Sequence, residues 1–173
     1  MSNHDIIKYL NPKASKEYID LYIEKKENLY KELLSKSNLQ LAEGSIEFFE
    51  YLKNHNIKFT IATSSGIENV SFFIKKYNLE KWFDIEKIVY NDFTFKGKPN
   101  PDIYFIAAKK IGVDIKNCII FEDSQNGIIS GEKSGAYKVI GITSSISKEN
   151  ILKMNGCVYA IENYKNFDYS VLN

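Results

Sequence analysis

The pattern of hydrophobic and polar positions divides the chain into a helical beginning and a longer part with mixed periodicity. Over the first 40 residues, apolar side chains recur about three to four positions apart among lysines and glutamates, which predicts a long amphipathic helix that begins near Ser15. Pro12 separates this helix from a shorter apolar segment. We therefore expect two parts, residues 1–40 and residues 41–173.

From residue 45 onward, short apolar runs alternate with helical segments. The expected helices begin at Ser45, at Ser65, at Pro101 and at Ser124. The second of these has the capping-box pattern of Ser65 and Glu68. The expected strands are residues 59–62, 85–89, 118–121, 138–142 and 158–161. Strands joined by crossover helices predict an α/β fold, a Rossmann-like parallel sheet with flanking helices.

Polar residues follow two of the expected strands, and in such sheets the ligand lies beyond the carboxyl ends of the strands. Glu122 and Asp123 follow one strand, where carboxylate oxygens would suit Mg²⁺. Thr63 and Ser64 follow another, just before a helix whose free N–H groups would suit a phosphate. Each arrangement also occurs as an ordinary cap of the next helix, so neither motif alone identifies a site.

Lys98 lies between Gly97 and Pro99, on a stiff loop that precedes the helix started by Pro101. A lysine fixed in this way could neutralise the charge of a phosphate. The alternative is an ordinary solvated lysine. The sequence contains no arginine, so any bound anion must be held by lysine, hydroxyl and backbone N–H groups.

Composition narrows the possible partners. The chain has 23 basic and 22 acidic residues, which gives no electrostatic reason to expect a nucleic acid or a membrane as partner. No apolar run approaches the roughly 18 residues of a membrane span, and the first residues lack the features of a secretory signal. The two cysteines, Cys118 and Cys157, do not form a disulfide framework or a zinc motif, so a cytoplasmic location is expected.

Three segments together are more specific than any of them alone. The sequences FTIATSS at 59–65, GKPNPDIY at 97–104 and FEDSQNGI at 121–128 occur in this order. They resemble motifs two, three and four of the haloacid dehalogenase-like (HAD) hydrolase superfamily, and more narrowly its β-phosphoglucomutase and sugar-phosphatase branch. The resemblance covers essentially the whole chain, since residues 23–30 resemble the last part of that branch's helical cap.

The resemblance implies phosphoryl transfer through an aspartyl-phosphate. By motif match, Thr63 and Ser64 would bind the phosphoryl oxygens and Lys98 would orient and neutralise the group. Asp123 would ligate Mg²⁺ with the support of Glu122. The implied substrate is a small phosphorylated metabolite, such as a sugar phosphate or a phosphoglycolate-like molecule, and a phosphatase is favoured over a phosphomutase.

The first motif of the superfamily, an apolar strand followed by Asp-x-Asp-Gly-Thr, is missing. None of the eight aspartates has another two positions away. In the superfamily this strand is central, between those that end here at Thr63 and Phe121. We therefore expect a truncated, inactive chain that binds Mg²⁺ weakly or not at all, and either forms a homo-oligomer or accepts a partner segment in the gap. Three possibilities stay open: a fragment of a complete enzyme, a short binding or regulatory module, and a chain completed by a separate polypeptide.

Overall fold

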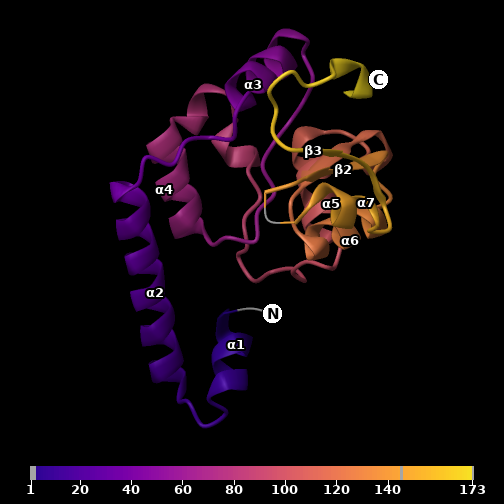
Figure 1. The fold of residues 1–173 in the computed structure, drawn as a ribbon. Coiled ribbons are helices and arrows are strands. Elements are labelled where there is room, and N and C mark those ends of the chain that lie inside the picture. Colours follow the sequence, from indigo (N-terminus) through magenta and orange to yellow (C-terminus); the bar gives the residue numbers. More distant parts are fainter. Residues whose placement is uncertain (1–2, 145, 173) are drawn as a thin grey trace. The chain divides into compact units, whose positions relative to one another are not determined.

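The computed structural model describes residues 3–144 and 146–172 and forms two compact units, Met1–Leu39 and Gln40–Asn173. The first unit contains helices α1 (Asn3–Leu10) and α2 (Lys16–Lys36) (Figure 1). Ser15 caps α2, since its hydroxyl accepts a hydrogen bond from the Tyr18 N–H at 3.2 Å, as the sequence predicts.

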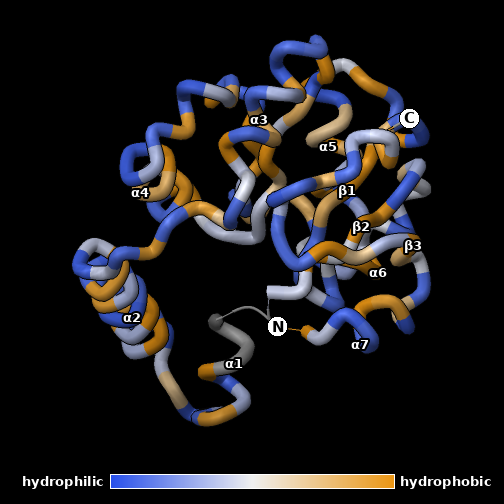
Figure 2. Tube along the Cα trace, turned by 45° about the horizontal axis from the view of Figure 1, so that its top comes forward, coloured by the Kyte–Doolittle hydropathy of each residue, from blue (hydrophilic) through white to orange (hydrophobic). Residues whose placement is uncertain are grey.

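The first unit buries few of its large apolar side chains. Its small core consists of Ile7, Ala14 and Ile19 with part of Ile23. Hydrophobic and hydrophilic positions alternate along the whole of α2 (Figure 2), and the large apolar residues of this helix that remain exposed are Tyr18, Leu21, Tyr22, Leu29, Tyr30 and Leu33.

The second unit contains a parallel sheet of three strands in the order β1 (Ile119–Glu122), β2 (Lys138–Ile142) and β3 (Cys157–Ile161). Helix α6 (Gln125–Ser134) connects β1 to β2, and α7 (Lys148–Leu152) lies between β2 and β3 in the chain (Figure 1). This parallel sheet with flanking helices confirms the predicted α/β class.

Among its described residues, the second unit also contains three further helices and four 3₁₀ turns. The helices are α3 (Ser45–Asn54), α4 (Ile67–Tyr77) and α5 (Asp102–Ile111). The 3₁₀ turns are η1 (Leu79–Lys81), η2 (Ile85–Lys87), η3 (Ile115–Asn117) and η4 (Tyr169–Leu172). No helix among the described residues is both long and apolar enough to cross a bilayer.

The two other predicted strands are reduced to a single parallel bridge between Ala62 and Val89. The Val89 N–H donates to the Ile61 carbonyl, and the Thr63 N–H donates to the Val89 carbonyl, both at 2.9 Å. The strand prediction at 85–89 was wrong in its first three residues, because the Asp84 carboxylate accepts from the Glu86 N–H and caps a 3₁₀ turn there.

The start of α4 also differs from the prediction. The helix begins at Ile67 with Gly66 as its N-cap, and no side chain caps it. Ser65, the predicted cap, instead donates its N–H to the hydroxyl of Thr63 at 3.1 Å. The capping-box prediction was therefore wrong, because this backbone N–H closes a turn at the end of the preceding segment.

The sheet is buried on both faces. Val139 packs in one cluster with Ile103 and Ile128, and its neighbour Ile140 packs in another with Phe48 and residues near the C-terminus. Because successive strand residues point to opposite faces, a continuous apolar run such as that of β2 indicates helices or loops on both sides. The sheet is thus the middle layer of this unit.

We expect Ile140→Ala to lower the free energy of unfolding by about 2–5 kcal/mol, because the Ile140 side chain is 0% exposed and its loss leaves a cavity. Val158→Ala is the matched control on β3, since Val158 is 62% exposed, and its effect should be about 0.5 kcal/mol or less. Urea unfolding measures the free energy of unfolding of both variants. Equal losses of stability would contradict the assignment of Ile140 to the buried interior and Val158 to the surface.

Candidate functional site

A buried ion pair lies at the end of β1. The Lys98 ammonium contacts Oε1 of Glu122, and the two side chains are only 11% and 8% exposed. The Tyr104 hydroxyl donates to the same oxygen, and the Ser124 hydroxyl donates to Oε2 at 3.2 Å. Both oxygens of this carboxylate are therefore held by protein donors, which is what a buried charge requires.

Local sequence explains how the donors reach Glu122. Lys98 comes from the loop before α5, and Tyr104 lies in the first turn of that helix. Ser124 caps α6, where its hydroxyl accepts from the Gly127 N–H at 3.1 Å. The Ser130 hydroxyl of α6 donates to the Asn100 carbonyl at 2.7 Å and so ties the lysine loop to the same helix.

Gly127 makes room for this carboxylate. A Cβ atom at this position would overlap the carboxyl group of Glu122. Gly127 lies in the first turn of α6 with an ordinary helical backbone, so its role is space and not an unusual φ angle. The close approach of α6 to the end of β1 thus depends on this one missing side chain.

Asp123 follows Glu122 and is exposed. The Ser144 hydroxyl donates to its Oδ2 at 3.0 Å. Two tyrosines near these carboxylates have raised pKa values. The pKa of Tyr104 is raised mainly by burial and secondly by the negative charge of Glu122. Burial, and secondly the charge of Asp123, raises the pKa of Tyr164 to about 12. Both phenols therefore stay protonated at neutral pH and can donate hydrogen bonds.

Thr63 and Ser64 come directly after Ala62, which forms a parallel bridge with Val89. The two residues therefore follow an extended segment, as the sequence predicts. Thr63 is half-buried and Ser64 is exposed. The structure brings Lys98 and Glu122 into contact, whereas within the described residues no hydrogen bond or ion pair joins Thr63 to either of them.

The oxygen donors here fit Mg²⁺ only if the ion keeps several waters. Among the residues that the structure describes, no three His, Cys, Asp or Glu side chains come together as a metal site. Asp123 offers an exposed carboxylate, while both oxygens of Glu122 accept hydrogen bonds from the protein. Mg²⁺ commonly binds through one or two carboxylates plus water and phosphate, so Asp123 is the candidate ligand.

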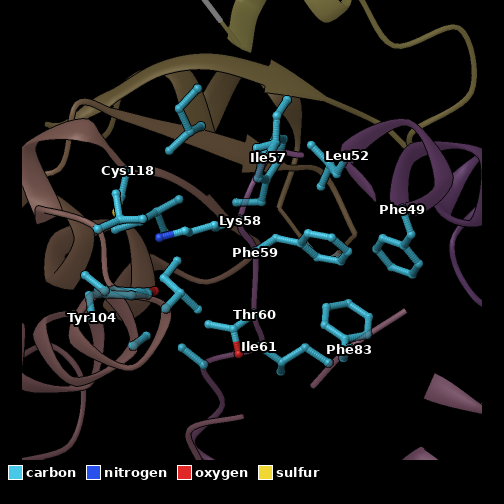
Figure 3. A pocket seen from close by; sticks show the side chains of 18 of the residues that line it. Phe49, Leu52, Ile57, Lys58, Phe59, Thr60, Ile61, Phe83, Tyr104 and Cys118 are labelled. Atoms are coloured by element: carbon cyan, nitrogen blue, oxygen red, sulfur yellow. The ribbon is translucent and has the colours of Figure 1, made fainter. Parts of the chain in front are cut away.

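An apolar groove of about 460 Å³ continues from this site between the segment 57–62 and β1. Glu122 and Tyr104 are among the residues that line it. Figure 3 shows the rings of Phe49, Phe59 and Phe83 on one side of the groove, with Tyr104 and Cys118 across from them.

Sequence reasoning missed four residues that support the site: Tyr104, Ser124, Gly127 and Ser144. For Gly127 a signal was present, because a glycine inside a helix costs about 1 kcal/mol relative to alanine and so suggests a packing reason. Ser144 lies on the loop after β2, and nothing in its local sequence indicates that it meets Asp123.

Comparison with known proteins identifies the family. The model of the haloacid dehalogenase-like hydrolases matches residues 1–142. The chain belongs to this family. The resemblance seen in the three sequence segments is therefore confirmed. A crystal structure of a HAD hydrolase, family IA, variant 3, from Entamoeba histolytica is 49% identical with a TM-score of 0.93, and the match covers 99% of this chain and 77% of that one.

Two further relatives are informative. A phosphorylated carbohydrates phosphatase of Thermotoga maritima is 28% identical over 139 residues, which are 80% of this chain and 61% of that protein. The β-phosphoglucomutase of Clostridium difficile shares the fold, with a TM-score of 0.80 at 20% identity over 99% of this chain and 75% of that one. The chain spans 61% and 42% of the lengths of the first two curated relatives it matches.

We expect Gly127→Ala to destabilise the protein by about 1–3 kcal/mol, because the added methyl group must displace the Glu122 carboxylate from its donors. Gly97→Ala is the control, since no atom lies within 4 Å of a Cβ there. Chemical denaturation compares the two. A Gly127→Ala protein as stable as the Gly97→Ala protein would show that α6 does not need this close approach.

We also expect strong coupling between Lys98 and Glu122. Lys98→Met leaves a buried carboxylate without its cation and should cost about 3–5 kcal/mol. Glu122→Gln should cost less in the Lys98→Met background than alone, with a coupling energy of about 1–3 kcal/mol. Unfolding of the two single variants and the double variant measures this energy, and additive losses would contradict the ion pair.

Proposed function

We propose that this chain carries the phosphate-binding and metal-binding part of a Mg²⁺-dependent phosphatase that acts on a small phosphorylated metabolite. The observation that carries the proposal is the buried Lys98–Glu122 pair, held by Tyr104 beside the exposed Asp123. Phosphoryl transfer depends mainly on positioning and on neutralising the phosphoryl oxygens. A fixed lysine next to an exposed carboxylate at a strand end is suited to that task.

In this proposal each residue has a separate task. Thr63 and Ser64 bind phosphoryl oxygens with their hydroxyl groups and with N–H groups near the start of α4. Lys98 neutralises the phosphoryl group, and Glu122 keeps the ammonium in place. Asp123, oriented by Ser144, holds Mg²⁺, which when bound shields the charge of the phosphate.

The reaction also needs a nucleophile. The nucleophile that the resemblance implies, the first aspartate of an Asp-x-Asp pair, is not among the 173 residues. In the superfamily an aspartate oxygen bonds to phosphorus while the ester P–O bond breaks and the leaving oxygen takes a proton, and water later hydrolyses the acyl phosphate. No Asp-x-Asp pair occurs in this sequence. We propose that the aspartate comes from a segment outside these residues, so that the chain by itself is truncated and inactive.

The phosphatase of Thermotoga maritima, which acts on phosphorylated carbohydrates according to its name, supports a sugar phosphate as the substrate class. The fold shared with β-phosphoglucomutase keeps a phosphomutase as the alternative reaction. A binding module without catalysis is the alternative of another class, and it predicts phosphate binding with no turnover in any form of the protein.

Both cysteines are free, in keeping with the proposed reducing cytoplasmic setting.

We expect the purified chain to bind Mg²⁺ weakly and to hydrolyse p-nitrophenyl phosphate no faster than its Asp123→Asn variant. Calorimetric titration with MgCl₂ should show affinity reduced by about tenfold or more in Asp123→Asn, because the direct ligand is lost. Asp114→Asn is the matched control, since Asp114 lies before β1 and caps η3.

Two results would contradict this account. Equal Mg²⁺ binding by the wild type and Asp123→Asn would remove Asp123 from the metal site. Phosphatase turnover by the chain alone that disappears in Asp123→Asn would show that the 173 residues already contain a nucleophile.

A further inference from the structure

Two asparagines in the chain are followed directly by glycine, in the pairs Asn126–Gly127 and Asn155–Gly156. In such a pair the backbone nitrogen of the glycine can attack the side-chain amide of the asparagine, because glycine has no side chain to obstruct the approach. The attack also requires a glycine N–H that is not hydrogen-bonded and a backbone that can rotate. The structure meets these requirements at one pair and not at the other.

Asn155 and Gly156 are the two central residues of a turn between α7 and β3. The Cys157 N–H donates to the Met154 carbonyl at 3.2 Å and closes this turn. Asn155 is exposed, and Gly156 has a φ angle of 88°, in the left-handed region that glycine adopts without strain. Among the described residues, no hydrogen bond uses the Gly156 N–H. The nitrogen of Gly156 is therefore available as a nucleophile.

Asn126 is also exposed, but its glycine has a different setting. Gly127 lies in the first turn of α6, where its N–H donates to the Ser124 hydroxyl at 3.1 Å. An attack by this nitrogen must break that hydrogen bond and open the first turn of the helix. Gly127 is buried against the Glu122 carboxylate, and a negative charge so close disfavours loss of the amide proton.

We propose that Asn155 is a site of spontaneous covalent modification, at which the turn converts asparagine to a mixture of isoaspartate and aspartate, while Asn126 is protected. The Gly156 nitrogen forms a bond to Cγ of Asn155, and the bond from Cγ to the side-chain nitrogen breaks. Ammonia leaves with the proton of the Gly156 amide. One water molecule then opens the cyclic imide at either of its two carbonyl carbons. No oxidant, reductant or cofactor takes part, and the inference is independent of the proposed function.

The modification changes the turn before β3. Isoaspartate adds one atom to the main chain and a carboxylate to a residue that was neutral. A Cβ atom at Gly156 would overlap the side chain of Glu132, so the turn packs closely against the end of α6. The new carboxylate would enter near Glu132, and like charges repel each other. We therefore expect the modified turn to lose the hydrogen bond between Met154 and Cys157.

The effect should stay at one edge of the sheet. The register between β2 and β3 shifts after Val139, so residues 159–161 pair with β2 separately from Cys157. In a parallel sheet the amino end of β3 and the carboxyl end of β1 lie at opposite edges. Glu122 and Asp123 are at the carboxyl end of β1, so the modification leaves the candidate site in place.

The test incubates the purified 173-residue chain in mildly alkaline buffer and removes samples over time. Trypsin cleaves after lysine and places the two asparagines on separate peptides, residues 117–133 and 154–165. Mass spectrometry measures the conversion of amide to acid, and electron-transfer fragmentation locates it and distinguishes isoaspartate from aspartate. The same chain unfolded in guanidinium chloride is the matched control, because both pairs then lose their local structure.

In the folded chain we expect Asn155 to react at least about tenfold faster than Asn126, because Asn126 reacts only when its helix opens. In guanidinium chloride the two rates should agree within about twofold, since glycine follows both asparagines. Asn155→Gln should prevent the reaction at this position, because the longer side chain forms a less favourable ring. After modification, the Cys157 amide should exchange its hydrogen at least about tenfold faster.

The possible outcomes decide the proposal. Faster reaction of Asn155 in the folded chain alone, with isoaspartate among the products, would support it. Equal rates in the folded chain would overturn it. The same selectivity in guanidinium chloride would also overturn it, by assigning the difference to sequence and not to structure. Aspartate without isoaspartate at Asn155 would show direct hydrolysis of the side-chain amide and would contradict attack by Gly156.

Discussion

The arrangement of the second unit depends on how two pieces of a parallel sheet lie on either side of an apolar groove. No described strand joins β1 to the Ala62–Val89 pair, so the two pieces are connected through α3, α5 and their side chains. Apolar side chains of both pieces line the groove, so whatever covers it stabilises the fold by removing them from water.

The same constraint reaches the candidate site. Glu122 ends β1 and lines the groove, while Lys98 and Tyr104 hold its carboxylate from the loop and helix on one side. A shift of β1 would therefore move both Glu122 and the adjacent Asp123. Thr63, for which we propose phosphate binding, lies on the other border. The two halves of the candidate site are therefore positioned by what joins the two sheet pieces.

The sequence predicted those elements that local chemistry determines. The β2 strand has the predicted bounds, and Ser124 and Gly135 delimit α6 as expected, because caps and left-handed glycines act within a few residues. The strand at 85–89 failed because the Asp84 side chain favours a 3₁₀ turn. The contact of Ser144 with Asp123 depends on the packing of separate loops, which no local pattern encodes.

Hydrogen exchange of the backbone amides in the 173-residue chain tests the central claim most directly. The Thr63 and Val89 amides, which are bonded across the bridge, should exchange at least about tenfold more slowly than those of Thr60 and Ala62, which face the groove. Equal protection at all four amides would contradict the account, because it would show that the edge at Thr60 and Ala62 is already paired.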